Sequence, residues 1–333
     1  QHSLALAPDD IAAFQAWAAG GAPEGDPAEY VAPEIRAMGL PRVDVSLAMA
    51  EPYTPAPPAG AIDDTRCFLL DWPETETRYV TGLAVNPGVV AQVHHALLLV
   101  AGPSAVPQLE ATDALDDGPG WSCPGGVVLG YTGWVGGWSP GWTAREMPEG
   151  TGQRVDPGSK LILTVHYSVP AGDAVPDTTS VDLMLEDEVD AQLAALTVSD
   201  ATWLTGGLRI PADEPDVRVS AQVAQPVPWT LLGVNLHMHE RGKRGSVGIV
   251  RADGTRECLL QIDDWAHEWQ GDYLFETPVD LALGESLWVE CHWDNTAGNQ
   301  RVVGGVAETP RDLGWAEDEE MCVAFVTARA PAP

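Results

Sequence analysis

Short apolar runs alternate with polar turn-forming residues along most of the chain. From about residue 66 onward, Gly, Pro and Asp interrupt the apolar runs roughly every ten residues. This pattern is typical of β-strands separated by turns. It predicts strands over residues 67–72, 79–84, 93–100, 161–167, 181–185, 217–223, 229–238, 247–251, 257–262, 287–293 and 321–327. The fold class that follows is all-β, with two consecutive antiparallel, jelly-roll-like β-sandwiches.

The first forty or so residues differ from this pattern. Apolar side chains recur at helical spacing over residues 9–19, behind Asp9, which we expect to cap the helix. A Pro-rich connector follows. The sequence therefore predicts an N-terminal helix and connector over 1–42, a first sandwich over 43–195 and a second sandwich over 196–333, with the break inside the segment 186–200.

Composition narrows the possible partners. The 333 residues carry 17 Lys and Arg against 49 Asp and Glu, a formal net charge of −32, and 45% of the residues are hydrophobic. So much apolar sequence argues against a disordered acidic chain, and so acidic a surface argues against binding nucleic acid or anionic membranes. No apolar stretch is long enough for membrane insertion. An acidic, lysine-poor protein of this kind is expected to be secreted or periplasmic, or to come from a salty habitat.

Histidines are the strongest chemical signal. His237 and His239 form an H-x-H on a predicted strand, so both imidazoles point to one face and could hold one metal. His94 and His95 are adjacent, and they could share a metal only at a strand end or a bulge. His166 alone on an apolar strand is also compatible with a hydrogen-bonded core residue. From spacing alone, a three-histidine zinc site is as plausible as copper, and Met321 by itself would be a core residue.

Taken together, these segments resemble the copper type II, ascorbate-dependent monooxygenases, the family of peptidylglycine α-hydroxylating and dopamine β-monooxygenases. The resemblance covers about residues 60–330 and rests on QVHHALLLV, LILTVHYS, LHMHERGKR and EEMCVAF. It implies two coppers per chain facing each other across a water-filled cleft. One would be bound by His94, His95 and His166, and the other by His237, His239 and Met321.

The resemblance also implies the activity. O₂ would be activated at the copper of His237, His239 and Met321, because a thioether favours Cu(I) and leaves an open position. Electrons would arrive through the three-histidine copper, and one oxygen atom would enter a C–H bond of a small organic substrate. The external donor would be ascorbate, or a c-type cytochrome module whose last helix the N-terminal segment resembles. The net charge should repel ascorbate unless a positive patch at Arg241, Lys243 and Arg244 steers it.

The cysteines fit the same family. The resemblance implies disulfides Cys67–Cys123 and Cys291–Cys322, and leaves Cys258, which we expect to be a buried free thiol. No C-x-x-C pair is present, which argues against a zinc knuckle, a thioredoxin motif or haem attachment in this chain.

Several positions depart from the peptide-amidating members. Asn235, Val323 and Phe325 stand where those enzymes clamp a substrate carboxylate, so an apolar substrate is expected instead. His267 is expected to be solvated. The alternative is that it contacts the metal-ligating side chains or the substrate. His292 is expected to be a packed strand residue. Two other function classes stay open: a copper-binding or electron-transfer protein without hydroxylation, and a zinc hydrolase that uses only the three-histidine set.

Overall fold

The computed structural model describes residues 6–26, 39–58, 61–123, 133–142, 144–169, 174–267, 270–303, 305–316 and 319–330. Contacts divide the chain into two units, Gln1–Met38 and Gly39–Pro333. His2 and most of the predicted connector lie outside the described residues. Among the described residues, no helix is both long and apolar enough to cross a membrane.

The N-terminal unit contains one helix, α1 (Pro8–Ala19). Asp9 does not cap it, so that prediction is wrong. The helix begins one residue earlier, because Pro8 occupies its first turn and Ala7 is the N-cap, with no side-chain hydrogen bond. Asp9 and Asp10 lie in the first turn, where the positive end of the helix dipole stabilises their negative charges.

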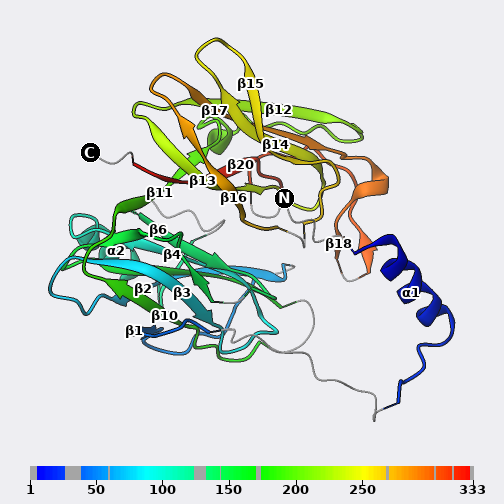
Figure 1. Cartoon of the computed structure of the whole chain (residues 1–333). Coiled ribbons are helices and arrows are strands. Elements are labelled where there is room, and N and C mark those ends of the chain that lie inside the picture. Colours follow the sequence, from blue (N-terminus) through cyan, green and yellow to red (C-terminus); the bar gives the residue numbers. More distant parts are fainter. Residues whose placement is uncertain are drawn as a thin grey trace. The chain divides into compact units, whose positions relative to one another are not determined.

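The second unit is built from β-strands, which confirms the predicted all-β fold (Figure 1). Its first half contains α2 (Val106–Asp113) and the strands β1 (Val45–Ala48), β2 (Asp63–Asp71), β3 (Arg78–Asn86), β4 (Val93–Ala101), β5 (Trp121–Ser122), β6 (Gly133–Trp138), β7 (Arg145–Glu146), β8 (Thr151–Val155), β9 (Lys160–Ser168) and β10 (Ser180–Glu186). Its second half contains two 3₁₀ turns, η3 (Trp203–Thr205) and η4 (Ala297–Asn299), and the strands β11 (Ala191–Val198), β12 (Val217–Ala224), β13 (Trp229–His237), β14 (Gly242–Val250), β15 (Arg256–Ile262), β16 (Tyr273–Leu281), β17 (Ser286–Trp293), β18 (Val302–Val303), β19 (Val306–Ala307) and β20 (Val323–Arg329).

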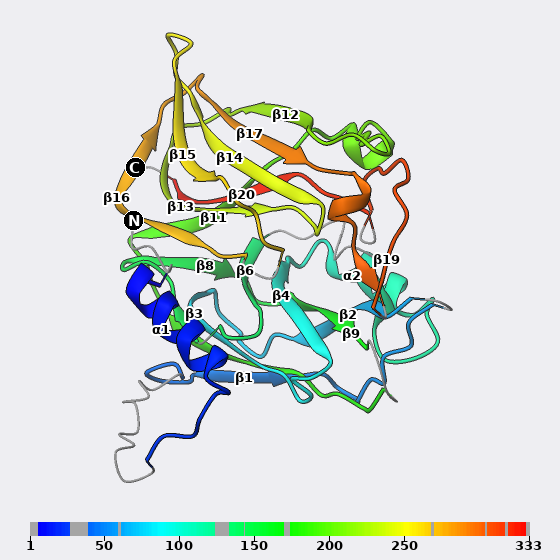
Figure 2. The same ribbon diagram turned by 90° about the vertical axis from the view of Figure 1, so that its right-hand side faces the viewer.

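One long sheet runs through both sandwiches. Its strand order is β1-β10-β3-β8-β11-β20-β13-β16, with β7 beside β3. The sheet β5-β2-β9-β4-β6 covers the first part of it, and the sheet β12-β17-β14-β15 covers the second part. β11 joins the parts, because it pairs in parallel with β8 and antiparallel with β20 (Figure 2). β11 extends across residue 195, the predicted end of the first sandwich. The predicted domain limits therefore stay a prediction.

Each sandwich has its own apolar core. In the first, inward side chains of β2, β4, β9 and β10 are buried together, with Leu98, Leu163 and Leu183 fully inside. In the second, side chains of β13, β14, β17 and β20 do the same around Trp293. These cores hold the strand ends that carry the histidines.

Two disulfides are present, Cys67–Cys123 and Cys291–Cys322, as the family resemblance implies. Cys258 is free but exposed, so the expectation of a buried thiol is wrong. The reason is a bulge in the edge strand β15. The register slips between the pair Val247–Leu260 and the pair Gly248–Cys258, and the strand is exposed from Arg256 to Cys258.

Candidate metal centre

A β-bulge brings the adjacent histidines of β4 together. Val93 pairs with Tyr167, but the next pair is His95 with His166, so one extra residue is inserted at His94. A regular strand would send neighbouring side chains to opposite faces, whereas a bulge re-aims one of them. The Nδ1 atoms of the two rings lie 3.3 Å apart. The sequence required such an irregularity for a shared metal, and the structure contains it.

His166 on β9 completes a three-histidine group with this pair. Its ring centroid lies 5.1 Å from that of His94 and 4.7 Å from that of His95. One ring nitrogen from each of the three lies within 4.8 Å of the others. Nε2 of His166 is 3.2 Å from Oδ1 of Asp63 on β2, a contact that fixes the orientation of the ring. Burial, followed by the neighbouring imidazoles, lowers the pKa of His95 well below its usual value. At pH 7 the His95 imidazole is therefore neutral and has a ring-nitrogen lone pair that can bind a metal.

The H-x-H pair forms the second group of nitrogen donors. His237 ends β13 and His239 follows in the turn, with 3.1 Å between their Nε2 atoms. Nδ1 of His237 is 2.7 Å from Oε1 of Gln270, and Nδ1 of His239 is 3.3 Å from the carbonyl of Glu319. When each Nδ1 donates its proton to these oxygens, each Nε2 keeps a lone pair. The two lone pairs are then available at one place.

The chain just before β20 runs alongside the H-x-H pair. β13 and β20 are antiparallel, with Leu236 opposite Ala324 and His237 opposite Val323. Continued by two residues, this register sets Met321 opposite His239. The Met321 side chain is buried, and the next residue, Cys322, is bonded to β17. The disulfide therefore anchors the segment that presents the thioether.

A buried carboxylate fixes the turn between His239 and β14. Glu320 accepts the backbone N–H groups of His239 and Arg241 at 3.0 and 2.8 Å, and the indole N–H of Trp293 at 2.7 Å. Burial raises the pKa of Glu320 to about 7. Two of the three donors come from this turn and the third from β17, so Glu320 ties the turn to β17.

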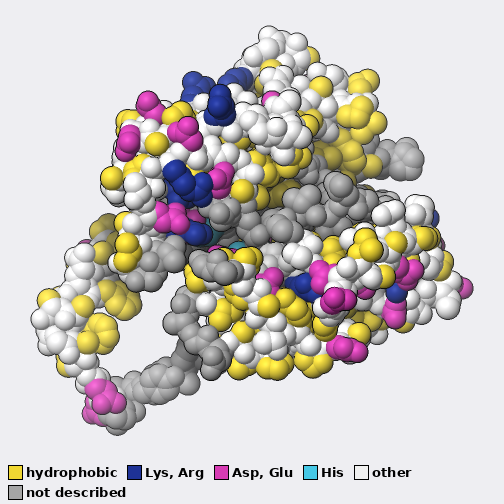
Figure 3. Space-filling view, turned by 180° about the vertical axis from the view of Figure 1, so that it is seen from behind, with side chains coloured by type: hydrophobic (Ala, Val, Ile, Leu, Met, Phe, Trp, Pro, Cys, Tyr) yellow, Lys and Arg dark blue, Asp and Glu magenta, His cyan; other side chains and the backbone are white. Residues whose placement is uncertain are grey.

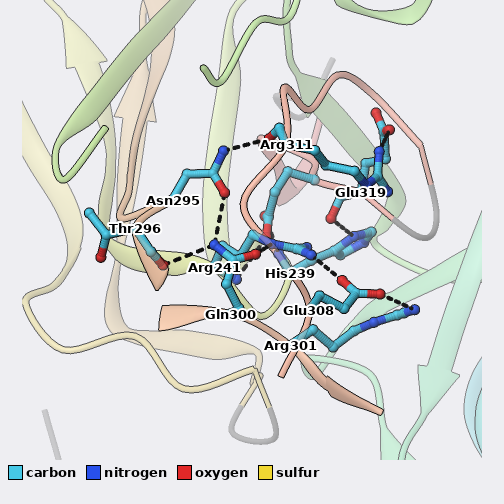
Figure 4. Close-up of polar contacts among 10 residues, drawn as sticks. His239, Arg241, Asn295, Thr296, Gln300, Arg301, Glu308, Arg311 and Glu319 are labelled. Atoms are coloured by element: carbon cyan, nitrogen blue, oxygen red, sulfur yellow. Dashed lines mark hydrogen bonds and ion pairs between the residues drawn. The ribbon is translucent and has the colours of Figure 1, made fainter. Parts of the chain in front are cut away.

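The Arg241 side chain lies behind this turn in a polar network (Figure 4). It is 1% exposed, forms an ion pair with Glu308 at 2.5 Å and donates from Nε to Gln300 at 3.1 Å. Arg241 therefore does not belong to a positive surface patch, and that prediction is wrong for this residue. Its side chain instead holds the segment between β17 and β20 in place. Arg244 pairs with Asp216 at 3.1 Å, which offsets its charge.

His267 was expected to be solvated, and that interpretation is wrong. Its ring is partly buried and packs on His94 of the first group and His239 of the second. A small area of histidine surface is visible between the two sandwiches in Figure 3. His292, by contrast, is a packed strand residue as expected, held between Asp216 and Glu290.

The three positions of the family's carboxylate clamp lie on the paired strands beside the second group. Asn235 is opposite Phe325, and its amide donates to the carbonyl of Gly271 at 3.1 Å. Val323 is buried. Phe325 stacks on Trp134 of β6, with centroids 5.3 Å apart and planes 17° from parallel. None of the three offers a cation to a carboxylate, and an aromatic pair connects the two sandwiches here.

The donor sets fit copper. Three imidazoles, or two imidazoles and a thioether, suit copper better than calcium or magnesium, which prefer oxygen ligands. The contacts of Asp63, Gln270 and the Glu319 carbonyl with the ring nitrogens are of the kind that orients metal-ligating histidines. Sequence reasoning did not identify Asp63, Gln270 or Glu320. The only signal was that Glu320 lies in the segment EEMCVAF, which resembles the family.

The depressed pKa of His237 predicts a pH effect on the metal-free protein. Burial lowers this pKa to about 4, against an ordinary value near 6.5. Between these values the unfolded chain binds a proton that the folded chain does not, so stability is lost as the pH falls through this window. Relative to a His237→Asn variant, the wild type should lose about 3 kcal/mol more stability between pH 7.5 and pH 4.

Urea unfolding of both metal-free proteins across a pH series measures this difference. The comparison with His237→Asn removes the effect of carboxylate repulsion, which both proteins share. Parallel pH curves for the two proteins would show that His237 titrates normally in the fold.

Comparison with known proteins finds one family match, in the second sandwich. Residues 221–328 match the family described as copper type II ascorbate-dependent monooxygenase, C-terminal domain. No curated protein matches the chain. Similar solved structures include the major capsid protein P2 from bacteriophage PM2, with 10% identity and a TM-score of 0.32 over 86% of this chain and 97% of that chain. Recombinant peptide:N-glycanase F has 10% identity and a TM-score of 0.37 over 86% and 95%. TM-scores this low support no conclusion about the fold or function of this chain. The segment that matches the C-terminal domain of the copper type II ascorbate-dependent monooxygenases includes the H-x-H pair and Met321.

Proposed function

We propose that the protein is a secreted dicopper monooxygenase that inserts one oxygen atom of O₂ into a C–H bond of a small organic substrate. One observation carries the proposal. The segment that matches the copper monooxygenase family contains two Nε2 atoms 3.1 Å apart and a buried methionine, and a separate three-histidine group lies in the same compact unit.

The two groups would have different tasks. Copper, when bound, supplies one-electron chemistry, and at a site with a thioether and an open position it supplies reactivity toward O₂. His237, His239 and Met321 would hold the reactive copper, and His94, His95 and His166 the copper that receives electrons. Gln270 and the Glu319 carbonyl keep Nε2 of each H-x-H imidazole unprotonated, and Glu320 holds the turn that sets their spacing.

The surroundings favour an apolar substrate. Phe325 and Trp134 form a stacked pair beside the second group, and Asn235 is engaged with a backbone carbonyl. A substrate carboxylate would lose its water here without gaining a guanidinium partner, at a cost of roughly several kcal/mol. Aromatic or aliphatic molecules therefore fit this position better than glycine-extended peptides.

The electron donor and location follow from charge and redox state. Two disulfides indicate an oxidising compartment, so we propose secretion or export to the periplasm. Each turnover needs two electrons from outside, from ascorbate or from a c-type cytochrome module. With net charge −32 and Arg241 buried, ascorbate gains little from local positive charge. A tethered donor would not depend on such attraction.

Metal analysis combined with an oxygen-uptake screen tests the proposal. The purified protein should bind two coppers and consume O₂ with a reductant and an apolar substrate, in step with hydroxylated product. Glycine-extended peptides, included in the screen, should show no saturable turnover. Two coppers without coupled product would favour the electron-transfer alternative. Zinc alone, bound at the three-histidine group, would favour a hydrolase and contradict the proposal.

A further inference from the structure

His267 lies between the two groups of metal-binding side chains. It follows β15 in the chain and belongs to neither group. Its ring stacks on His94, with centroids 6.0 Å apart and planes 14° from parallel. Its other neighbour is His239, 5.9 Å away at an interplanar angle of 81°. Offset-stacked and edge-to-face arrangements at such distances are the favoured contacts of aromatic rings. One imidazole therefore touches one histidine of each group.

Gln270 fixes this ring together with a histidine of the second group. Its Nε2 lies 3.2 Å from Nδ1 of His267 and 3.0 Å from the His267 carbonyl, while its Oε1 lies 2.7 Å from Nδ1 of His237. An amide nitrogen only donates, so Nδ1 of His267 accepts and the proton of the neutral ring is on Nε2. The same amide oxygen accepts from His237. One side chain thus sets the orientation of both rings.

The His267 ring gives the two groups a shared aromatic neighbour. The two groups are therefore joined by van der Waals contacts between aromatic rings. Electron transfer falls off steeply with distance and is faster through packed groups than through solvent. A continuous row of three imidazoles is a favourable path between two redox centres.

We propose that His267 is the connection through which an electron passes from the three-histidine group to the H-x-H pair. This inference rests on the proposed function, since it requires copper at both groups. With copper bound by both groups, one electron would pass from Cu(I) at the first group, leaving Cu(II) there, to Cu(II) at the second group, giving Cu(I). An external reductant of the ascorbate class restores the first copper. No bond or proton changes at His267, which acts as a positioning residue and not as a ligand.

A His267→Ala variant of the copper-loaded chain tests the connection. The wild type and the variant, both fully oxidised, are mixed with ascorbate, frozen at intervals and examined by electron paramagnetic resonance. The control is His292→Ala, which removes a histidine of the same sandwich whose side-chain hydrogen-bond partners are Arg244, Asp216 and Glu290. Transfer between the groups does not depend on ascorbate concentration, whereas direct reduction increases with it. We expect the concentration-independent phase to slow roughly ten-fold in His267→Ala and to stay unchanged in His292→Ala.

Copper content and the resting spectrum separate the remaining outcomes. His267→Ala should keep two coppers and the wild-type spectrum, and loss of one copper would overturn the inference by making His267 a ligand. An unchanged transfer rate with two coppers bound would also overturn it, while leaving the proposed function intact. A wild-type protein that binds no copper would overturn both. If the alanine variant does not fold, His267→Gln, which keeps polarity but loses the ring, should show the same slowing.

Discussion

A Met321→Leu variant should lose O₂-dependent turnover by at least about a hundred-fold while keeping its fold and the copper of the three-histidine group. Leucine is close to methionine in volume, so the cost to stability should stay below about 1.5 kcal/mol. The sulfur, however, is the soft donor of the copper site that we propose at the H-x-H pair. Copper analysis and oxygen uptake on the same preparations measure both effects.

The matched control for this experiment is Met184→Leu. Met184 is buried to the same degree, but on β10 of the first sandwich, away from either group of histidines. It should keep full turnover. If Met321→Leu retains wild-type activity, Met321 is a core residue and the second copper site is not the one proposed.

Removing the Cys291–Cys322 disulfide should destabilise the protein and impair the second site together. The bond closes a loop with a sequence separation of 31 residues, which corresponds to about 3.5 kcal/mol on the chain-entropy account. Alanine at both positions should therefore lower the free energy of unfolding by roughly that amount. Because Cys322 follows Met321 directly, the copper of the H-x-H pair should be bound more weakly, and that of the three-histidine group should be unaffected.

Cys258→Ala is the control for cysteine loss, since that thiol is free and exposed on an edge strand. It should leave both stability and copper affinity unchanged. A double alanine variant that unfolds at a lower denaturant concentration but binds two coppers with wild-type affinity would show that the disulfide supports the fold and not the site.

Much of the fold could be predicted because the strands in the core have continuous apolar runs. All eleven predicted strands are present within a few residues, among them β4, β9, β13 and β20, which carry or flank the histidines. The missed strands lack this signal. β16 is at the sheet edge and contains Pro278, and most of its residues alternate between exposed and partly buried. β11 is rich in alanine, and only its pairing with two other strands makes it extended.

The ligand-type residues could be identified from the sequence because they lie in short motifs whose order matches a family. The residues that orient them could not. Asp63 reaches His166 across 103 positions, and Gln270 reaches His237 across 33. Such contacts depend on how strands pair and how loops cross, which no local pattern records. The same reason explains His267, whose neighbours come from both sandwiches.

The long sheet has a consequence for any attempt to divide this protein. The family match begins at residue 221, inside β12, and so leaves out β11, which supplies one of the two neighbours of β20. A fragment cut at that point would expose the backbone donors and acceptors along one side of β20, the kind of bare edge on which chains aggregate. We therefore expect isolated 221–328 to be poorly soluble, and residues 39–333 to melt in a single cooperative transition.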